Sequence, residues 1–264
     1  MPSYPAGMTV SNRSLIMLAD ALRQRRTMLG TKWRRLAPGR QALLVVAHLR
    51  KGETYADLAR GFAVGTTTVY RYLREGLDVL AALAPTLSQA IDVARQKAFV
   101  TLDGTLLRID RVGMTAGHDR AYYSGKHKAH GVNVQVIADP AGRLVWASPA
   151  LPGACHDIAA AREHGILDAL AAAGISTVAD TGYQGAGPNV AVPQRRRRLD
   201  PDTGHYRRLS EAQKEVNTAH ARQRGPGERV NAQLKSWKIL RKIRSSPDQA
   251  TTLVKAVQTL ILAS

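Results

Sequence analysis

The chain has 264 residues, of which 44% are hydrophobic, so it is long enough for one large domain or two modest ones around a real core. Lys and Arg number 38 against 20 Asp and Glu, and the net charge of +18 favours a polyanionic partner, nucleic acid before an anionic membrane. The single cysteine, Cys155, excludes a disulfide framework within the chain and a cysteine-rich zinc site, and it is consistent with a cytosolic compartment. The longest apolar run, residues 42–47, is too short to span a bilayer, and no signal peptide is evident, so we expect no membrane role.

The first part of the chain is predicted to be helical, because apolar residues before about residue 95 recur at helical spacing. Within it, residues 57–73 (DLARGFAVGTTTVYRYL) have the pattern of a helix-turn-helix motif. Val64 and Gly65 are expected to form the turn, and Thr66 or Thr67 to cap the second helix.

We place the whole helix-turn-helix motif at about residues 54–75, and its second helix is expected to read DNA. Its apolar face carries Val69, Tyr72 and Leu73. A plain helical hairpin is the alternative, and the basic charge of the chain favours DNA binding over it. The side chains expected to face a DNA groove are Thr67, Tyr70, Arg71 and Arg74.

A domain boundary is predicted after Pro85, so that residues 1–92 form an all-helical domain and residues 93–264 an α/β domain. Residues 157–173 are predicted to form a helix with Asp157 as its N-cap. A meander of strands followed by a helix and another strand favours a mixed sheet. The expected strands are residues 98–102, 131–138, 143–148 and 175–179.

The last third of the chain concentrates the positive charge. Residues 194–206 are predicted to be a loop that contains four consecutive arginines. A helix is expected over residues 208–222, with residues 225–227 (GPG) interrupting it and Glu228 opening a final pair of helices. Residues 195–244 hold 15 Lys and Arg against 5 Asp and Glu, more than half of the net charge, which favours a binding surface.

Three acidic residues stand out by their context. Asp103 is expected to end the strand AFVTLD, and Asp180 to end the strand ISTVAD before a glycine-rich turn. Glu228 begins the helix GERVNAQLKSW and projects away from its apolar stripe. Each alone is explained by a turn or by a helix dipole. Together they can converge at one edge of a sheet, where carboxylate oxygens suit Mg²⁺, and in a basic protein that predicts phosphodiester chemistry.

The order of these segments resembles the DDE-type transposases of bacterial insertion sequences, with the closer match to the insertion-sequence-five group and the related Harbinger-type nucleases. The resemblance rests on DGT at residues 103–105, PGACHD at 152–157, ADTGYQG around Asp180 and NTAHARQRGPGERVNAQLKSWKIL around Glu228. It implies an α/β, ribonuclease-H-like mixed sheet with flanking helices, preceded by the helix-turn-helix domain. It also implies that Asp103, Asp180 and Glu228 bind two divalent metal ions, Mg²⁺ or Mn²⁺.

The same resemblance implies supporting roles for further residues. His156 and Asp157 would lie close to the catalytic edge, although an N-cap role remains an alternative for Asp157. Arg224 is expected to position a phosphate by bidentate hydrogen bonds. The expected DNA contacts of this part of the chain are Lys126, Lys128, Arg195, Arg196, Arg224, Arg229 and Lys235.

The sequence therefore predicts a bacterial, cytoplasmic and nucleoid-associated transposase. We expect it to bind terminal inverted repeats of double-stranded DNA, to cut and join strands with a divalent metal ion, and to form a homo-oligomer when two ends are brought together. One alternative is a DNA-binding regulator or catalytically decayed remnant, which would bind DNA without cutting it. Another is a metal-dependent endonuclease that hydrolyses DNA without joining strands.

Overall fold

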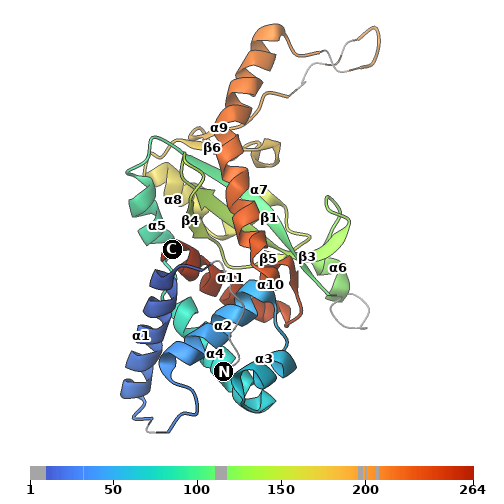
Figure 1. The fold of residues 1–264 in the computed structure, drawn as a ribbon. Helices are drawn as coiled ribbons and strands as arrows, with labels where there is room; N and C mark the ends of the chain where they lie inside the picture. Colours follow the sequence, from blue (N-terminus) through green and yellow to red (C-terminus); the bar gives the residue numbers. More distant parts are fainter. Residues whose placement is uncertain (1–9, 32, 111–117, 196–198, 200, 206–207) are drawn as a thin grey trace.

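The computed structural model describes residues 10–31, 33–110, 118–195, 199, 201–205 and 208–264. The chain begins with a group of helices and continues as a sheet that further helices cover on both faces (Figure 1). The first helices are α1 (Asn12–Met28), α2 (Pro38–Lys51), α3 (Tyr55–Phe62), α4 (Thr66–Ala82) and α5 (Leu87–Ala94).

Helices α3 and α4 form the expected helix-turn-helix. Thr54 caps α3 by accepting a hydrogen bond from the backbone N–H of Asp57, and Ala63 takes a left-handed conformation at the turn, with φ of 55°. The prediction that Thr66 or Thr67 caps the second helix is wrong, because α4 begins at Thr66 and Gly65 is its N-cap without a side-chain hydrogen bond. The predicted apolar face of α4 is buried, as expected for a helix that packs on its neighbours.

The sheet is mixed and has eight strands among the described residues. Its main path runs β2-β3-β1-β6-β7, with β4 and β5 also pairing with β3, and β8 with β1. The long strands β1 and β3 pair antiparallel, whereas β6 pairs parallel with β1 on the other side. The strands are β1 (Val100–Ile109), β2 (Tyr123–Ser124), β3 (Ala129–Ala138), β4 (Leu144–Ala147), β5 (Leu151–Pro152), β6 (Thr177–Ala179), β7 (Val190–Ala191) and β8 (Lys242–Ile243).

Helices cover both faces of this sheet, so its strands are apolar on both sides. The long helix α9 crosses one face, and its first turns extend beyond the body of the molecule (Figure 1). That face shares a hydrophobic core with α10, α11 and the N-terminal helices, whereas α5, α7 and α8 pack on the other face. The remaining helices are α6 (His118–Tyr122), α7 (Asp157–Glu163), α8 (Ile166–Ala172), the 3-10 turn η1 (Thr181–Tyr183), α9 (Glu211–Ser236), α10 (Lys238–Arg241) and α11 (Pro247–Leu262).

The last helix, α11, joins the helical part of the chain to the sheet. Thr259 Oγ1 donates to the carbonyl of Leu80 in α4 at 2.9 Å, and Gln258 Oε1 accepts from the backbone N–H of Ala147 in β4 at 2.5 Å. The domain boundary at residue 92 stays a prediction. Within the described residues no single helix is long and apolar enough to cross a membrane, and α4 with α5 meets those criteria only as a pair bent by 49°.

Two predicted helix boundaries are wrong. The helix expected over residues 157–173 divides into α7 and α8, because Gly165 between them adopts a left-handed conformation with φ of 67°. A helix break was predicted at residues 225–227, but α9 continues through them. A Cβ on Gly227 would lie 2.5 Å from Thr101 Oγ1, so the missing side chain lets α9 approach β1 closely. Tertiary packing thus outweighs the local preference of Gly and Pro for a turn.

Candidate active site

Two carboxylates lie side by side because of the pairing of β1 with β6. These parallel strands put Leu102 opposite Ala179, and Asp103 and Asp180 are the next residues of each strand's chain. Strand β6 ends there, but β1 continues, so the prediction that Asp103 ends its strand is wrong. The reason is that β3 goes on pairing with β1 well past Asp103. The predicted convergence of Asp103 and Asp180 follows directly from this register.

The environment of Asp103 disfavours its charged form. Burial first, and then the carboxylate of Asp180, raises the pKa of Asp103 to about 6, whereas the Arg224 guanidinium acts in the opposite direction. The carboxylate of Asp157 makes a smaller contribution that also raises this pKa. A further cation at this edge of the sheet would therefore stabilise the ionised carboxylates.

Asp180 also shapes the turn that follows it. Its Oδ1 accepts a hydrogen bond from the backbone N–H of Gly182 at 2.8 Å and so caps η1. Its Oδ2 lies 3.9 Å from the Nζ atom of Lys126. One oxygen of Asp180 thus holds the glycine-rich turn, and the other faces the ammonium group of Lys126.

A third carboxylate, Asp157, joins the two strand aspartates. The prediction that Asp157 caps its helix is wrong, because His156 is the N-cap of α7 and makes no side-chain hydrogen bond there. Asp157 Oδ1 instead accepts from Asn133 Nδ2 at 2.9 Å, and Oδ2 accepts from Lys126 Nζ at 3.2 Å. A Cβ on Gly104 would lie 2.1 Å from Asp157 Oδ1, so the glycine after Asp103 leaves the space that this carboxylate occupies.

Buried hydrogen bonds fix the position of Asp157. Asn133 and Gln135 are two residues apart on β3, so their side chains lie on the same face of the sheet. Tyr183 donates its hydroxyl to Gln135 Oε1 at 2.5 Å, and Gln135 Nε2 donates to Asn133 Oδ1 at 2.8 Å. Asn133 then donates to Asp157 and to the carbonyl of Cys155. Each buried polar group in this chain of bonds has a partner, which favours one arrangement of the site.

Helix α9 lays a stripe of polar side chains over this edge of the sheet. Asn231 Nδ2 donates to Asp103 Oδ2 at 2.8 Å. Burial lowers the pKa of Lys235, and the carboxylate of Asp103 partly opposes that effect. The spacing of the stripe is i, i+4, i+7 and i+11, which keeps its members on one helical face. Its members are Arg224, Glu228, Asn231 and Lys235.

Glu228 faces its own helix in this structure. Its Oε1 accepts from Arg224 Nη2 at 2.7 Å, and the side chain is 60% exposed. Among the described residues, no group of three or more His, Cys, Asp and Glu side chains lies close enough together to hold a metal ion. The structure places Asp103 and Asp180 on neighbouring strands, and Asp157 on the other side of the Lys126 ammonium from Asp180. It does not bring Glu228 to them, but places it one helical turn before Asn231 on the same stripe.

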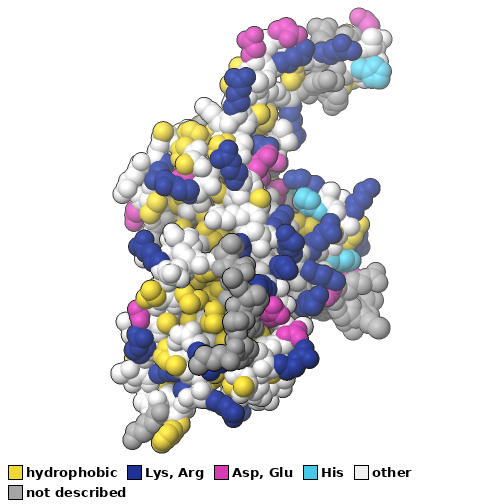
Figure 2. Space-filling view, viewed as in Figure 1, with side chains coloured by type: hydrophobic (Ala, Val, Ile, Leu, Met, Phe, Trp, Pro, Cys, Tyr) yellow, Lys and Arg dark blue, Asp and Glu magenta, His cyan; other side chains and the backbone are white. Residues whose placement is uncertain are grey.

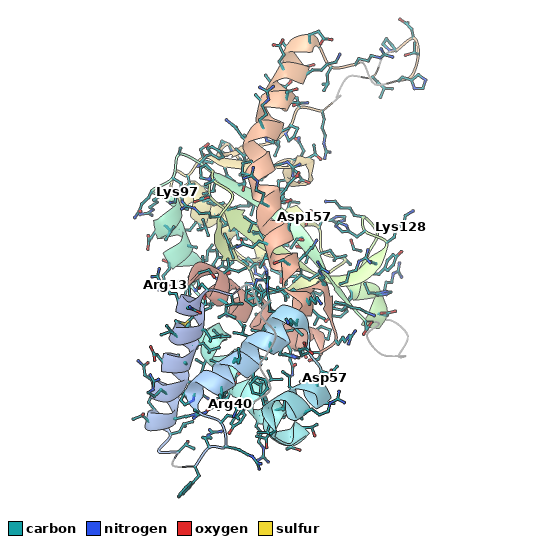
Figure 3. The ribbon with its side chains drawn as sticks, viewed as in Figure 1. Arg13, Arg40, Asp57, Lys97, Lys128 and Asp157 are labelled. Carbon is teal, nitrogen blue, oxygen red and sulfur yellow. The ribbon has the colours of Figure 1, made fainter. Side chains whose placement is uncertain are left out.

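Basic side chains lie on the surface near α9, some close to the carboxylates and some farther away. Figure 2 shows Lys and Arg gathered where α9 passes the turn between β2 and β3. Lys126 and Lys128 are exposed in that turn, and Figure 3 shows Lys128 at the outer edge of the molecule, away from Asp157. Arg229 is exposed on α9 and lines a hollow with Arg143.

The structure describes only one of the two loop arginines that were predicted to contact DNA. Arg195 Nη2 donates to the carbonyl of Thr181 at 2.5 Å, which places its side chain at the turn after Asp180. Arg196 lies outside the described residues. His156 is exposed beside Asp157 at the start of α7.

The predicted DNA-reading side chains of α4 lie on the surface. Thr67 and Arg71 are exposed, and Tyr70 is 40% exposed. Arg74 Nη1 donates to the Tyr70 hydroxyl at 3.2 Å, and the Tyr70 ring contacts Tyr55 of α3 at a centroid distance of 6.2 Å. This face is polar, aromatic and positively charged, which suits contact with a DNA groove.

Sequence reasoning missed the amide side chains of the site. Asn133 and Gln135 alternate with valines in GVNVQVIA, and two polar residues on one face of an otherwise apolar strand are a signal for a buried polar site. Asn231 follows Glu228 by three residues, which puts both on one helical face. Tyr183 carries no such signal, because only the fold brings its hydroxyl to Gln135.

Comparison with known proteins gives a consistent result. The family described as "DDE superfamily endonuclease" matches residues 102–261, and the family described as "Helix-turn-helix of DDE superfamily endonuclease" matches residues 34–86. A protein of Streptomyces albus G named "Putative transposase for insertion sequence element IS112" is 34% identical over 232 residues, which cover 87% of this chain and 79% of that protein. No solved structure matches.

Proposed function

Because this chain belongs to the DDE superfamily of endonucleases, we propose that it is a transposase that binds the terminal inverted repeats of an insertion sequence and then cuts and joins DNA strands. The observation that carries the proposal is the pairing of Asp103 with Asp180 beneath the polar stripe of α9. We also propose that the mixed sheet and its flanking helices form a ribonuclease-H-like core.

The donor set at this edge suits Mg²⁺ or Mn²⁺. The candidate ligands are carboxylate oxygens. Burial and the Asp180 carboxylate raise the pKa of Asp103, so neighbouring cations do not fully balance the negative charge of these carboxylates. Asp103 and Asp180 would hold the ions, and Glu228 would complete the set after leaving Arg224. A bound ion would polarise the phosphate and activate the attacking oxygen.

The remaining residues of the site hold and orient DNA. We propose that Arg224 gives up its hydrogen bond to Glu228 when DNA binds. Its guanidinium would then bind a phosphate with two hydrogen bonds. Lys235 and Arg195 border the same edge, and Lys128 lies farther out in the turn between β2 and β3; all three would add positive charge for the DNA backbone. Asn231 keeps the Asp103 carboxylate oriented throughout.

We propose that the exposed face of α4 reads the terminal repeat. Tyr70, Arg71 and Arg74 would contact bases and phosphates. Bringing two ends together requires two protein copies, so we propose a homo-oligomer in the complex with DNA. Affinity for DNA should fall with salt by about 0.9 log units per log unit of salt for each phosphate contact.

The test is strand cleavage and joining on labelled DNA that flanks the protein's own reading frame, with Mg²⁺ or Mn²⁺. Wild type is compared with Asp180→Ala and with the control Asp92→Ala, which changes an exposed aspartate on α5. We expect metal-dependent joined products from wild type and the control, and DNA binding without products from Asp180→Ala.

Other outcomes select the alternatives. Cut products that are never joined would assign the chain to the endonucleases that only hydrolyse DNA. Binding without any cutting by wild type would favour a DNA-binding regulator. Products from Asp180→Ala would remove Asp180 from the catalytic site.

A further inference from the structure

The turn between β2 and β3 holds a lysine ammonium against the carboxylates of the site. Lys126 Nζ lies 3.2 Å from Asp157 Oδ2 and 3.9 Å from Asp180 Oδ2. We propose that Lys126 is a tethered counter-cation, which neutralises Asp157 and Asp180 in the metal-free protein and which a divalent ion must displace in order to bind. The inference rests on the proposed metal-dependent function.

Asp157 is the fixed partner in this arrangement. Its side chain is 14% exposed, and Asn133 holds its second oxygen through bonds that continue to Gln135 and Tyr183. The Lys126 side chain, by contrast, is 61% exposed and reaches the site from the turn residues 125–128. A rigid acceptor and a flexible donor make a contact that the lysine can leave without disturbing the sheet.

The charges around Lys126 explain why it stays in place without metal. Its ammonium lies 3.2 Å from an oxygen of Asp157 and 3.9 Å from an oxygen of Asp180, so two negative charges hold it at this edge of the sheet. Asp180 is also one of the ligands that we propose for a divalent ion, so the ion and the ammonium compete for the same carboxylate. An ion with two charges would attract the Asp180 carboxylate more strongly than one ammonium does, so its binding would displace Nζ from Asp180.

The role assigned to Lys126 makes it a positioning residue that opposes metal binding in the free protein. Titration of the full chain with Mn²⁺ in the absence of DNA measures this directly. Lys126→Met should raise the affinity for Mn²⁺ about fivefold or more, since one charge about 4 Å from a carboxylate is worth that factor even in water. Lys126→Arg keeps the charge and should stay nearer to wild type than to Lys126→Met.

Lys128→Met is the matched control, because it removes one positive charge from the same turn. Lys128 is exposed, and no hydrogen bond or ion pair joins it to the three aspartates in the described structure. A gain in Mn²⁺ affinity confined to Lys126→Met supports the inference. Equal gains from both variants would overturn it, because general charge rather than a seated ammonium would then be responsible.

A double-mutant cycle with Asp157→Asn tests the anchor. Without the Asp157 charge, Lys126 has lost its near partner, so Lys126→Met should raise the Mn²⁺ affinity less than it does in the wild-type background. Equal effects in both backgrounds would show that Asp157 does not seat the lysine. If neither wild type nor Lys126→Met binds Mn²⁺, the proposed metal-dependent function fails and the inference with it, which separates that failure from the others.

Discussion

The sheet edge and helix α9 carry the acidic residues of the site in different ways. Asp103 and Asp180 are placed by backbone register, and Asp157 is held by a series of buried hydrogen bonds. Glu228 depends on the rotamer of an exposed side chain and on one ion pair with Arg224. Moving a sheet carboxylate would require a change in the core, whereas moving Glu228 requires only that its partner be exchanged.

This difference divides the site into a preformed half and an adjustable half. On the proposed function, the sheet edge supplies the geometry for the metal ion before DNA arrives. On the same function, α9 would complete the site when Arg224 binds a phosphate and releases Glu228. The comparison predicts that substitutions of the residues packed around Asp157 strongly reduce cleavage or stability. Substitutions of the Arg224–Glu228 pair on α9 should change stability only slightly.

The largest effect is expected from Gly104→Ala. The new Cβ would lie 2.1 Å from Asp157 Oδ1 and 3.0 Å from Gln135 Nε2, so the Asp157 carboxylate must move from its present position. Strand cleavage should fall on the order of 100-fold, the usual consequence of a displacement of about 1 Å in a catalytic site. Gly39→Ala is the control, because its Cβ would meet nothing within 4 Å. Normal cleavage by Gly104→Ala would show that the sheet edge is not preformed.

The next prediction concerns the pH dependence of the free energy of unfolding. Burial, and then Asp180, raises the pKa of Asp103 from 3.8 to about 6 in the folded chain. The folded chain therefore binds more protons than the unfolded chain between about pH 4 and 6, so the free energy of unfolding falls as pH rises through this window. The loss should be at most about 3 kcal/mol, and Asp103→Asn should remove it. Urea unfolding in the presence of a chelator measures both, and an unchanged pH dependence in Asp103→Asn would contradict the assignment.

A smaller effect is expected from Tyr183→Phe. The substitution leaves Gln135 Oε1 buried without the donor that now lies 2.5 Å away, which should cost about 1–3 kcal/mol in the free energy of unfolding. Tyr123→Phe serves as the control, because Tyr123 is 42% exposed and should change stability by less than about 0.5 kcal/mol. Equal unfolding curves for the two variants would mean that the buried bonds do not hold the sheet edge.

The smallest effect on stability is expected from Arg224→Gln. Its ion pair with Glu228 is exposed, so the free energy of unfolding should change by less than about 1 kcal/mol. Mn²⁺ binding without DNA should become tighter, since Glu228 is released and one positive charge is lost. Arg222→Gln, at an exposed position of the same helix, controls for charge. Destabilisation as large as that of Tyr183→Phe would remove the distinction between the two halves.

The sequence predicted the elements whose signals are local. Periodicity predicted the helix-turn-helix and the strands that became β1, β3, β4 and β6, whereas the two-residue strands β2, β5, β7 and β8 were not predicted. The apolar runs before Asp103 and Asp180 placed the two aspartates beside each other, although β1 continues past Asp103. The turn at Gly165 and the continuity of α9 through Gly227 were mispredicted, because a glycine serves equally as a helix end or as a point of close approach.

The rest of the site depends on contacts between distant segments. Asp157 has the sequence context of a helix cap, and only the space left by Gly104 and the bond from Asn133 turn it toward the sheet. Asn231 meets Asp103 because α9 is rotated in one particular way, and that rotation is set by packing against β1. Neither the rotation of a helix nor the partner of a polar side chain is encoded in local periodicity.

Helix α11 has a consequence for how DNA would be handled. It is hydrogen-bonded to α4 on one side and to β4 on the other, and the buried face of α4 shares a hydrophobic core with one face of the sheet. On the proposed function, the number of base pairs between the sequence read and the phosphate cut is then fixed by the fold and not by a linker. Inserting about five base pairs between them would turn that phosphate to the opposite side of the duplex. The protein would in this way act as a ruler along the DNA end that it processes.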